Sequence, residues 1–122
     1  MKSVLCLGWC MWLLVGCGTQ SKHHERYYQE RLCEQMQGQM EHRLFDATRV
    51  DCLTSEYAIE VDFSKKWAQS VGQALYYAKI SGKKPAVALI VDESKKEQRH
   101  LKRLRVLARA YGISVFKIEK EE

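Results

Sequence analysis

Apolar residues along this chain follow two kinds of spacing, which predict helices and strands in a definite order. Residues three and four positions apart share one face of a helix, and this spacing predicts helices over residues 25–36, 65–81 and 93–111. Alternating or unbroken apolar runs predict strands over residues 39–45, 48–53, 57–63, 86–91 and 113–118. The expected order, α-β-β-β-α-β-α-β, indicates an α/β (α+β) domain whose mixed sheet is flanked by helices.

The same pattern predicts how the elements pack. Three successive strands with short links favour an antiparallel meander, and the unbroken apolar run of residues 86–91 suits a strand covered on both faces. Gly82 and Gly112 follow the second and third helices and are expected to end them. The buried stripe of the second helix is expected to contain Trp67, Val71, Leu75 and Ala78.

The N-terminal residues are typical of a secretory signal. A short positive lead precedes an apolar run over residues 4–15, which is too short for a permanent membrane span. Residues 14–17, Leu-Val-Gly-Cys, resemble the lipobox of bacterial lipoproteins, where the cysteine is acylated after cleavage. We therefore expect a lipoprotein signal peptide over residues 1–16, a lipid on Cys17 and a tether over residues 17–24. Ordinary signal cleavage and an uncleaved anchor are the alternatives.

The residue after the predicted lipidation site indicates the location. Gly18 stands where an aspartate would favour retention at the inner membrane. The expected location is therefore the outer membrane, with a domain over residues 25–122 facing the periplasm. Several acyl chains on Cys17 would hold the protein firmly in the membrane. Cleavage would leave 106 of the 122 residues, which suits one small domain.

Two cysteines lie within the predicted domain, Cys33 and Cys52. The oxidising periplasm allows a disulfide between them, which would join the first helix to the second strand. Two buried free thiols are the alternative, because cysteine is commonly buried without a partner. Chain spacing leaves both open, since a bridge requires close Cα atoms. The pair lacks the spacing typical of zinc ligands.

Three acidic residues stand out because they interrupt apolar strands. Asp51 lies in the second predicted strand, and Glu60 and Asp62 lie two positions apart in the third. Residues two apart on a strand share a face, so both can point toward Asp51. Converging carboxylates repel one another unless a proton or cation intervenes, and Mg²⁺ is the usual cation for oxygen ligands. The alternative is that Glu60 and Asp62 line the solvated face of an edge strand.

Motifs in the same region resemble a known nuclease family. RVDCLT, YAIEVDF, KKW and GQALYYA are similar to a group of small bacterial proteins usually placed near the PD-(D/E)XK nuclease superfamily. The likeness extends over residues 25–118. Gln73 and Tyr77 match the Q-x-x-x-Y helix motif of its exonuclease-like branch. The resemblance implies a restriction-endonuclease-like α-β-β-β-α-β core.

The resemblance also implies Mg²⁺-dependent hydrolysis of a phosphodiester bond, with Asp51 and Glu60 as metal ligands. The catalytic set that it implies is Asp51, Glu60, Asp62, Lys66, Gln73 and Tyr77. Asp62 stands where the family carries a lysine, two residues after the glutamate. Lys65 or Lys66 could supply the missing charge, or Asp62 could be a further metal ligand. Glu25 could add a carboxylate, Gln73 and Tyr77 could orient the metal ligands or the phosphate, and the site could equally be inactive.

Basic residues crowd the third predicted helix, in a chain of net charge +5: Lys95, Lys96, Arg99, Lys102, Arg103, Arg105 and Arg109. They could form an ordinary solvated face, follow a nucleic-acid backbone or contact anionic lipid headgroups. The sequence therefore supports two classes of function. One is a membrane-anchored nuclease acting on DNA, and the other is a catalytically inactive module of the same fold that serves as an envelope binding or interaction protein.

Overall fold

Five strands form one mixed sheet in the computed structural model, which describes residues 21–122. The strands are β1 (Gln39–Arg43), β2 (Arg49–Leu53), β3 (Tyr57–Phe63), β4 (Lys84–Val91) and β5 (Ser114–Glu119). The helices are α1 (Glu25–Gln35), α2 (Trp67–Ser81) and α3 (Lys95–Tyr111), and a 3₁₀ turn, η1 (Ser64–Lys66), precedes α2. The predicted element order and the α+β class are confirmed. The predicted signal peptide, Cys17 and the first part of the tether lie outside the described residues.

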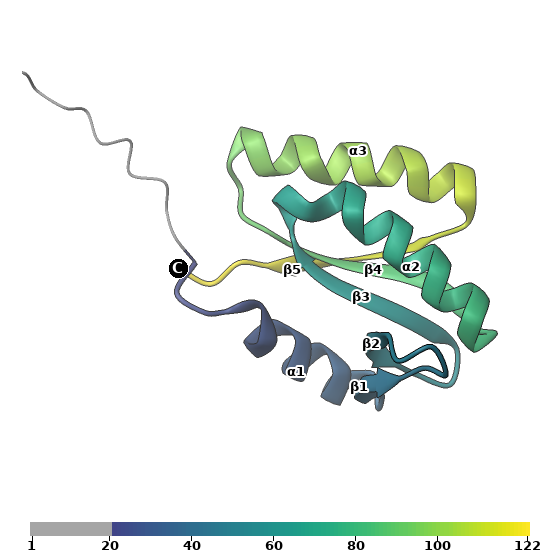
Figure 1. The fold of residues 1–122 in the computed structure, drawn as a ribbon. Helices are drawn as coiled ribbons and strands as arrows, with labels where there is room; N and C mark the ends of the chain where they lie inside the picture. Colours follow the sequence, from purple (N-terminus) through teal and green to yellow (C-terminus); the bar gives the residue numbers. More distant parts are fainter. Residues whose placement is uncertain (1–20) are drawn as a thin grey trace, which may run out of the picture.

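The sheet follows the order of the chain, β1-β2-β3-β4-β5. The first three strands pair antiparallel, which confirms the predicted meander, and β3, β4 and β5 pair parallel. Parallel neighbours need a crossover connection, and α2 and α3 supply the two crossovers on one face of the sheet (Figure 1). α1 packs on the other face, against β1, β2 and β3. β3 is therefore the central strand and is covered on both faces.

Alternate residues of β4 belong to the two different faces of the sheet. The cluster under α2 and α3 takes from β4 the side chains of Val87, Leu89 and Val91. The cluster on the α1 side takes Ala86, Ala88 and Ile90. Because both faces are buried, this strand has no polar side to alternate with, which accounts for its unbroken apolar sequence.

The helix and strand ends follow local signals, although every predicted element except β3 differs by one or two residues at an end. Gly82 and Gly112 end α2 and α3 in the left-handed conformation, at φ 70° and 66°, as expected. β1 ends at Arg43, two residues before the predicted end, because the Leu44 and Thr48 backbones hydrogen-bond across a turn. Within residues 21–122, no helix is long and apolar enough to cross a membrane.

α2 buries a broader face than its sequence pattern predicts. Val71 and Ala78 are buried as expected, but Trp67 and Leu75 are only partly buried at the edge of the cluster. The remaining buried positions are Ser70, Ala74 and Tyr77. α2 lies over β3 as well as β4, so its buried face is wider than the predicted apolar stripe and includes small and polar residues.

Cys33 of α1 and Cys52 of β2 form a disulfide, with 5.6 Å between their Cα atoms. Of the two alternatives that the sequence left open, the structure has the bridge. Both cysteines are buried in the apolar cluster on the α1 side of the sheet. The bridge therefore fastens α1 to the strand that bears Asp51.

Gly38 lies against this disulfide, and we expect that it tolerates no side chain. A Cβ atom on Gly38 would lie 2.9 Å from the Cys33 Sγ and closer still to the Cys52 Sγ. The buried bridge cannot move aside without disturbing both α1 and β2. Gly38→Ala should therefore lower the free energy of unfolding by about 1–3 kcal/mol, measured by urea denaturation of the oxidised protein.

Gly72 provides the matched control. It lies inside α2, and a Cβ atom there would meet nothing within 4 Å. Gly72→Ala should stabilise the protein by about 0.5–1 kcal/mol, because alanine favours the helix. A loss of stability of the same size in both variants would contradict the steric explanation for Gly38.

Candidate functional site

β2 and β3, the strands that carry the predicted carboxylates, separate at Asp51. Their ladder pairing involves residues 52–53 of β2, whereas β3 pairs with β4 along its whole length. At the point of separation, the Asp51 Oδ2 accepts a hydrogen bond of 2.8 Å from the Val61 N–H. The Asp51 side chain, rather than the backbone of β2, thus accepts the hydrogen bond from Val61, and its carboxylate is directed toward β3.

α1 fixes the backbone at the same point. The Gln29 side-chain amide donates hydrogen bonds to the Asp51 carbonyl oxygen at 2.9 Å and to the Glu41 Oε1 at 2.8 Å. Glu41 has a left-handed backbone with φ 50°, which is uncommon for any residue other than glycine. Sequence reasoning missed both residues, because a glutamine on a helix and a glutamate on a strand carry no local signal of this contact.

Glu60 and Asp62 lie on the face of the sheet that α2 covers. Their exposed fractions are 3% and 5%, so both carboxyl groups are buried. The alternative of a solvated edge-strand face is wrong, because β3 is the central strand of five. The charges of Asp51 and Asp62 both act on Glu60 and raise its pKa.

Within residues 21–122, Glu60 forms no ion pair with a cationic side chain. Burial raises the pKa of Glu60 to about 9, and the charges of Asp51 and then Asp62 add to the shift. Burial also raises the pKa of Asp51, to about 7. The Glu60 Oε1 is buried without a hydrogen-bond partner within residues 21–122. Each of these features favours a proton or a cation at Glu60, because a buried carboxylate without either is costly.

Asp62 has the partners that Glu60 lacks. The Ser70 hydroxyl of α2 donates a hydrogen bond of 2.6 Å to its Oδ2. The Lys66 ammonium lies 3.6 Å from the Asp62 Oδ1 and 3.5 Å from the Glu25 Oε2. Burial and then the Asp62 charge raise the pKa of Glu25, while Glu25 is the main cause that raises the pKa of Lys66.

The structure thus distinguishes between the two candidate lysines. Lys66 reaches the carboxyl groups from η1, whereas Lys65 is exposed. The lysine charge lies four residues after Asp62 rather than in its place on the strand. Ser70 is a further residue that sequence reasoning missed; its only signal is that it lies one helical turn beyond Lys66.

Gln73 and Tyr77 lie beside the same group, on the buried side of α2. Tyr77 is buried, and burial raises its pKa. The Glu60 charge is the second cause, and a hydrogen bond with Gln73 opposes the shift. The predicted catalytic residues are therefore joined by successive contacts. Lys66 of η1 meets Asp62 and Glu25, the charges of Asp51 and Asp62 act on Glu60, and Tyr77 and Gln73 follow farther along α2.

These residues fit a divalent cation in part. Within residues 21–122, no three His, Cys, Asp or Glu side chains are placed to hold one metal ion. The carboxyl groups form two close pairs instead, Asp51 with Glu60 and Glu25 with Asp62. The first pair offers oxygen atoms alone, one of them without a partner, and Mg²⁺ normally takes one or two carboxylates and fills its other positions with water.

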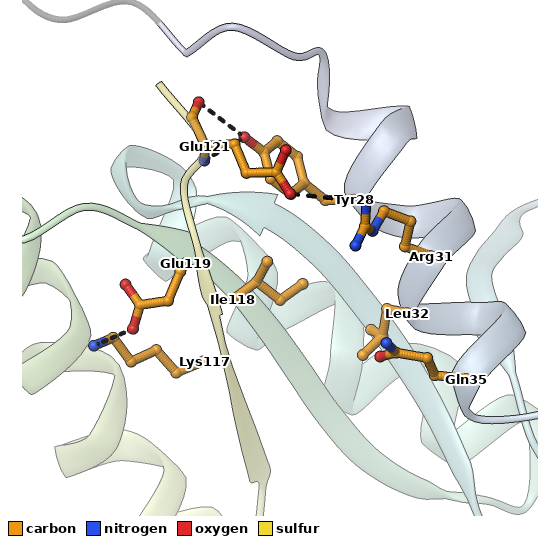
Figure 2. A pocket seen from close by; sticks show the side chains of 8 residues that line it. All are labelled: Tyr28, Arg31, Leu32, Gln35, Lys117, Ile118, Glu119 and Glu121. Carbon is orange, nitrogen blue, oxygen red and sulfur yellow. Dashed lines mark hydrogen bonds and ion pairs between the residues drawn. The ribbon is translucent and has the colours of Figure 1, made fainter.

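A groove lies elsewhere on the described part of the molecule. Figure 2 shows a groove of about 230 Å³ between α1 and β5, lined by Tyr28, Arg31, Leu32, Gln35, Lys117, Ile118, Glu119 and Glu121. None of the predicted site residues lines it. The carboxyl groups therefore form a site of their own.

The fold and this site define an α+β protein with a buried cluster of carboxyl groups and one lysine. Comparisons with protein families, with curated proteins and with solved structures found no match.

Proposed function

We propose that this protein is a metal-dependent nuclease that hydrolyses phosphodiester bonds of DNA, with Mg²⁺ held by Asp51 and Glu60. The observation that carries the proposal is the buried pair itself. Both members have strongly raised pKa values, and one Glu60 oxygen has no partner within the described residues. Mg²⁺ bound there would polarise the phosphate and lower the pKa of the attacking water.

The remaining side chains have roles that their contacts support. Lys66 keeps its charge beside Asp62 and Glu25, so it can offset the negative charge of a phosphate that approaches this end of the site. Ser70 holds Asp62 in a fixed orientation through its hydrogen bond. Tyr77 lies near Glu60 and Gln73 hydrogen-bonds Tyr77, so the two side chains can orient Glu60 or donate hydrogen bonds to the phosphate.

A catalytically inactive binding or interaction module is the second candidate, and two observations favour it. The described residues contain no three-ligand metal group, and both oxygen contacts of the Lys66 ammonium are with carboxylates. In that case the protein keeps the fold while Asp62, at the position of the family's lysine, prevents the chemistry.

The proposal includes a location. The protein is a lipoprotein anchored through Cys17, at the outer membrane and facing the periplasm. The Cys33–Cys52 disulfide supports this, because disulfides persist in an oxidising compartment.

The test uses residues 21–122, which contain every strand pair and core cluster described above and are therefore expected to fold alone. Calorimetry with Mg²⁺ and Mn²⁺ should detect binding, and single- and double-stranded DNA should be cleaved in the presence of metal. Asp51→Ala and Glu60→Ala should each reduce both by about a hundredfold or more. Glu56→Gln, a change at an exposed carboxylate paired with Lys84, is the control and should change neither.

Each result separates the candidates. Metal binding that depends on Asp51, without cleavage of either DNA, favours the inactive module. Absence of metal binding contradicts the metal site altogether. Loss of cleavage in Lys66→Ala with unchanged metal binding would support the role given to Lys66.

A further inference from the structure

The outer face of α3 carries a concentration of positive charge that no ion pair within the described part of the chain balances. Every one of its Lys and Arg side chains is exposed: Lys95, Lys96, Arg99, Lys102, Arg103, Arg105 and Arg109. None of them forms an ion pair with another side chain of residues 21–122. Elsewhere, Arg26, Lys84 and Lys117 lie against carboxylates, while other exposed cations are unpaired but do not share one helix face.

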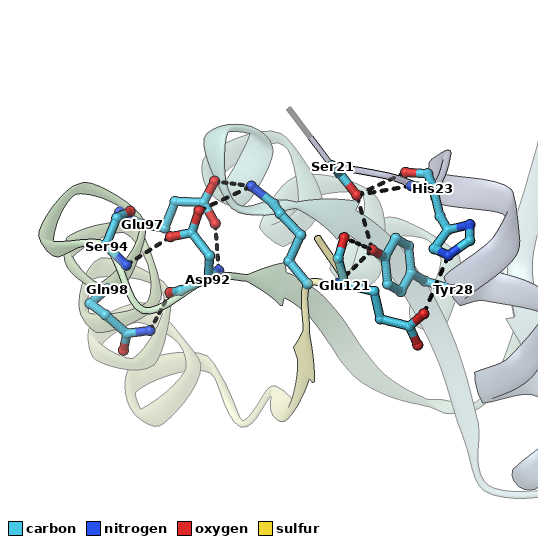
Figure 3. Close-up of polar contacts among 9 residues, drawn as sticks. Ser21, His23, Tyr28, Asp92, Ser94, Glu97, Gln98 and Glu121 are labelled. Carbon is cyan, nitrogen blue, oxygen red and sulfur yellow. Dashed lines mark hydrogen bonds and ion pairs between the residues drawn. The ribbon is translucent and has the colours of Figure 1, made fainter. Parts of the chain in front are cut away.

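The one acidic residue of α3 does not neutralise this face. Glu97 turns toward the sheet, where it pairs with the buried ammonium of Lys120 and accepts a hydrogen bond of 2.7 Å from the Asp92 N–H (Figure 3). Lys120 also lies 3.5 Å from the Asp92 Oδ2. Near the start of α3, Asp92 and Glu97 are thus engaged with Lys120 and Glu93 with Lys117, so none of the three pairs with a cation of the outer face.

Apolar surface lies among these cations. Val106 is 65% exposed and Tyr111 is 61% exposed. Val106 shares a stripe with Lys102 and Arg109, because residues three and four apart lie on one helical face. A helix face that combines long basic side chains with exposed apolar or aromatic groups suits the boundary between phospholipid headgroups and acyl chains. A phosphate backbone alone would not favour an exposed valine.

The start of the described chain lies at the same end of the molecule as the first turn of α3. Ser21 and the Tyr28 hydroxyl are 2.9 Å apart, and the His23 Nε2 lies 3.3 Å from the Glu121 Oε2. Glu121 directly follows Lys120, which pairs with Glu97. Figure 3 shows the contacts around Glu121 beside the contacts around Glu97. Cys17 lies four positions before Ser21. A fully extended chain of this length reaches at most about 14 Å.

We propose that the outer face of α3 binds an anionic phospholipid surface. The bound groups are the headgroup phosphates, contacted by the Lys and Arg side chains, with Val106 at the acyl boundary. With a lipid on Cys17, the tether would bring the start of this face to the bilayer, and α3 would add a second attachment. The inference does not depend on the proposed nuclease activity.

The experiment measures partition of residues 21–122, which lack the acylation site, into vesicles of phosphatidylcholine with increasing phosphatidylglycerol. Binding should be absent without the anionic lipid, increase with its fraction and fall as salt is raised. Each Lys or Arg near such a surface contributes about fivefold in partition, so the triple variant R99Q/K102Q/R109Q should bind about a hundredfold more weakly. Val106→Glu should weaken binding further without disturbing the core, since Val106 is exposed.

A control with the same loss of charge tests whether position matters. R43Q/R49Q/K79Q removes three exposed cations outside α3 and should retain most of the binding. Equal losses in the two triple variants would overturn the proposal, because net charge would then explain the binding. It would also be overturned if the α3 variant bound vesicles as the wild type does, or lost affinity for a DNA duplex alone. Circular dichroism of each variant checks that the fold is intact.

Discussion

Reduction of the Cys33–Cys52 disulfide is expected to lower the free energy of unfolding by about 3 kcal/mol. The bridge joins residues separated by 19 positions, and closing a loop of this size restricts the unfolded chain by about that amount. The bridge also helps to hold α1 against β2, beside the Gln29 hydrogen bond to Asp51, so reduction loosens the helix that supplies Gln29 and Glu25. For a domain of about one hundred residues, the melting temperature should fall by on the order of 15 °C.

The measurement compares thermal and urea unfolding of residues 21–122 with and without a reductant. The segment contains no other cysteine, so free thiols counted after denaturation report on this bridge alone. The double variant C33A/C52A should resemble the reduced protein and should not respond to the reductant. Identical unfolding of oxidised and reduced protein, or two free thiols before reduction, would show that the bridge does not form.

Stability without metal is expected to fall as the pH rises from 5 to 9. Burial raises the pKa of Glu60 to about 9 and that of Asp51 to about 7. The folded protein therefore holds protons that the unfolded chain, with ordinary carboxyl pKa values near 4, has already released. Stability from these protons is fully present below pH 4 and is lost as the pH rises through the folded pKa values, by at most about 1.4 kcal/mol per pH unit and group. Other titratable groups surround this pair. The charges of Asp62, Glu41 and Glu25 act on Asp51, and Tyr77 lies near Glu60.

Urea unfolding at pH 5, 7 and 9 with a chelator measures this slope. Glu60→Gln removes the titrating group with little change of shape, so it should flatten the profile and be more stable than wild type at pH 9. Glu56→Gln, at the surface, should leave the slope unchanged. Mg²⁺ should flatten the wild-type profile if it occupies the Asp51–Glu60 pair. A level wild-type profile without metal would mean that these carboxyl groups are ionised and hydrated.

The sequence predicted the order of elements well because the signals for it are local. β3 has the predicted bounds, Tyr57–Phe63, and α2 and α3 end before the predicted glycines. Apolar periodicity and left-handed glycine are properties of a few neighbouring residues, so they can be read without a fold. The inner face of α2 was predicted less well, because which residues are buried there depends on β3 and β4.

The candidate site was predicted in its members but not in its arrangement. Asp51, Glu60 and Asp62 could be identified because acidic residues in apolar strands are unusual. Their burial, the choice of Lys66 over Lys65 and the contribution of Ser70 and Gln29 could not, since each depends on contacts between separate elements. The signal peptide, the lipid on Cys17, the metal and the reaction on DNA stay predictions.

By itself, the sequence determined the α+β class, the order of the elements, the antiparallel meander, and the residues that could take part in chemistry. Only the tertiary structure decided that Cys33 meets Cys52, that β2 and β3 part at Asp51, and that Glu60 is buried without a partner in the described chain. Periodicity records which side of an element is apolar. It does not record which element lies against that side, and the charges, bonds and pKa values of a site depend on that neighbour.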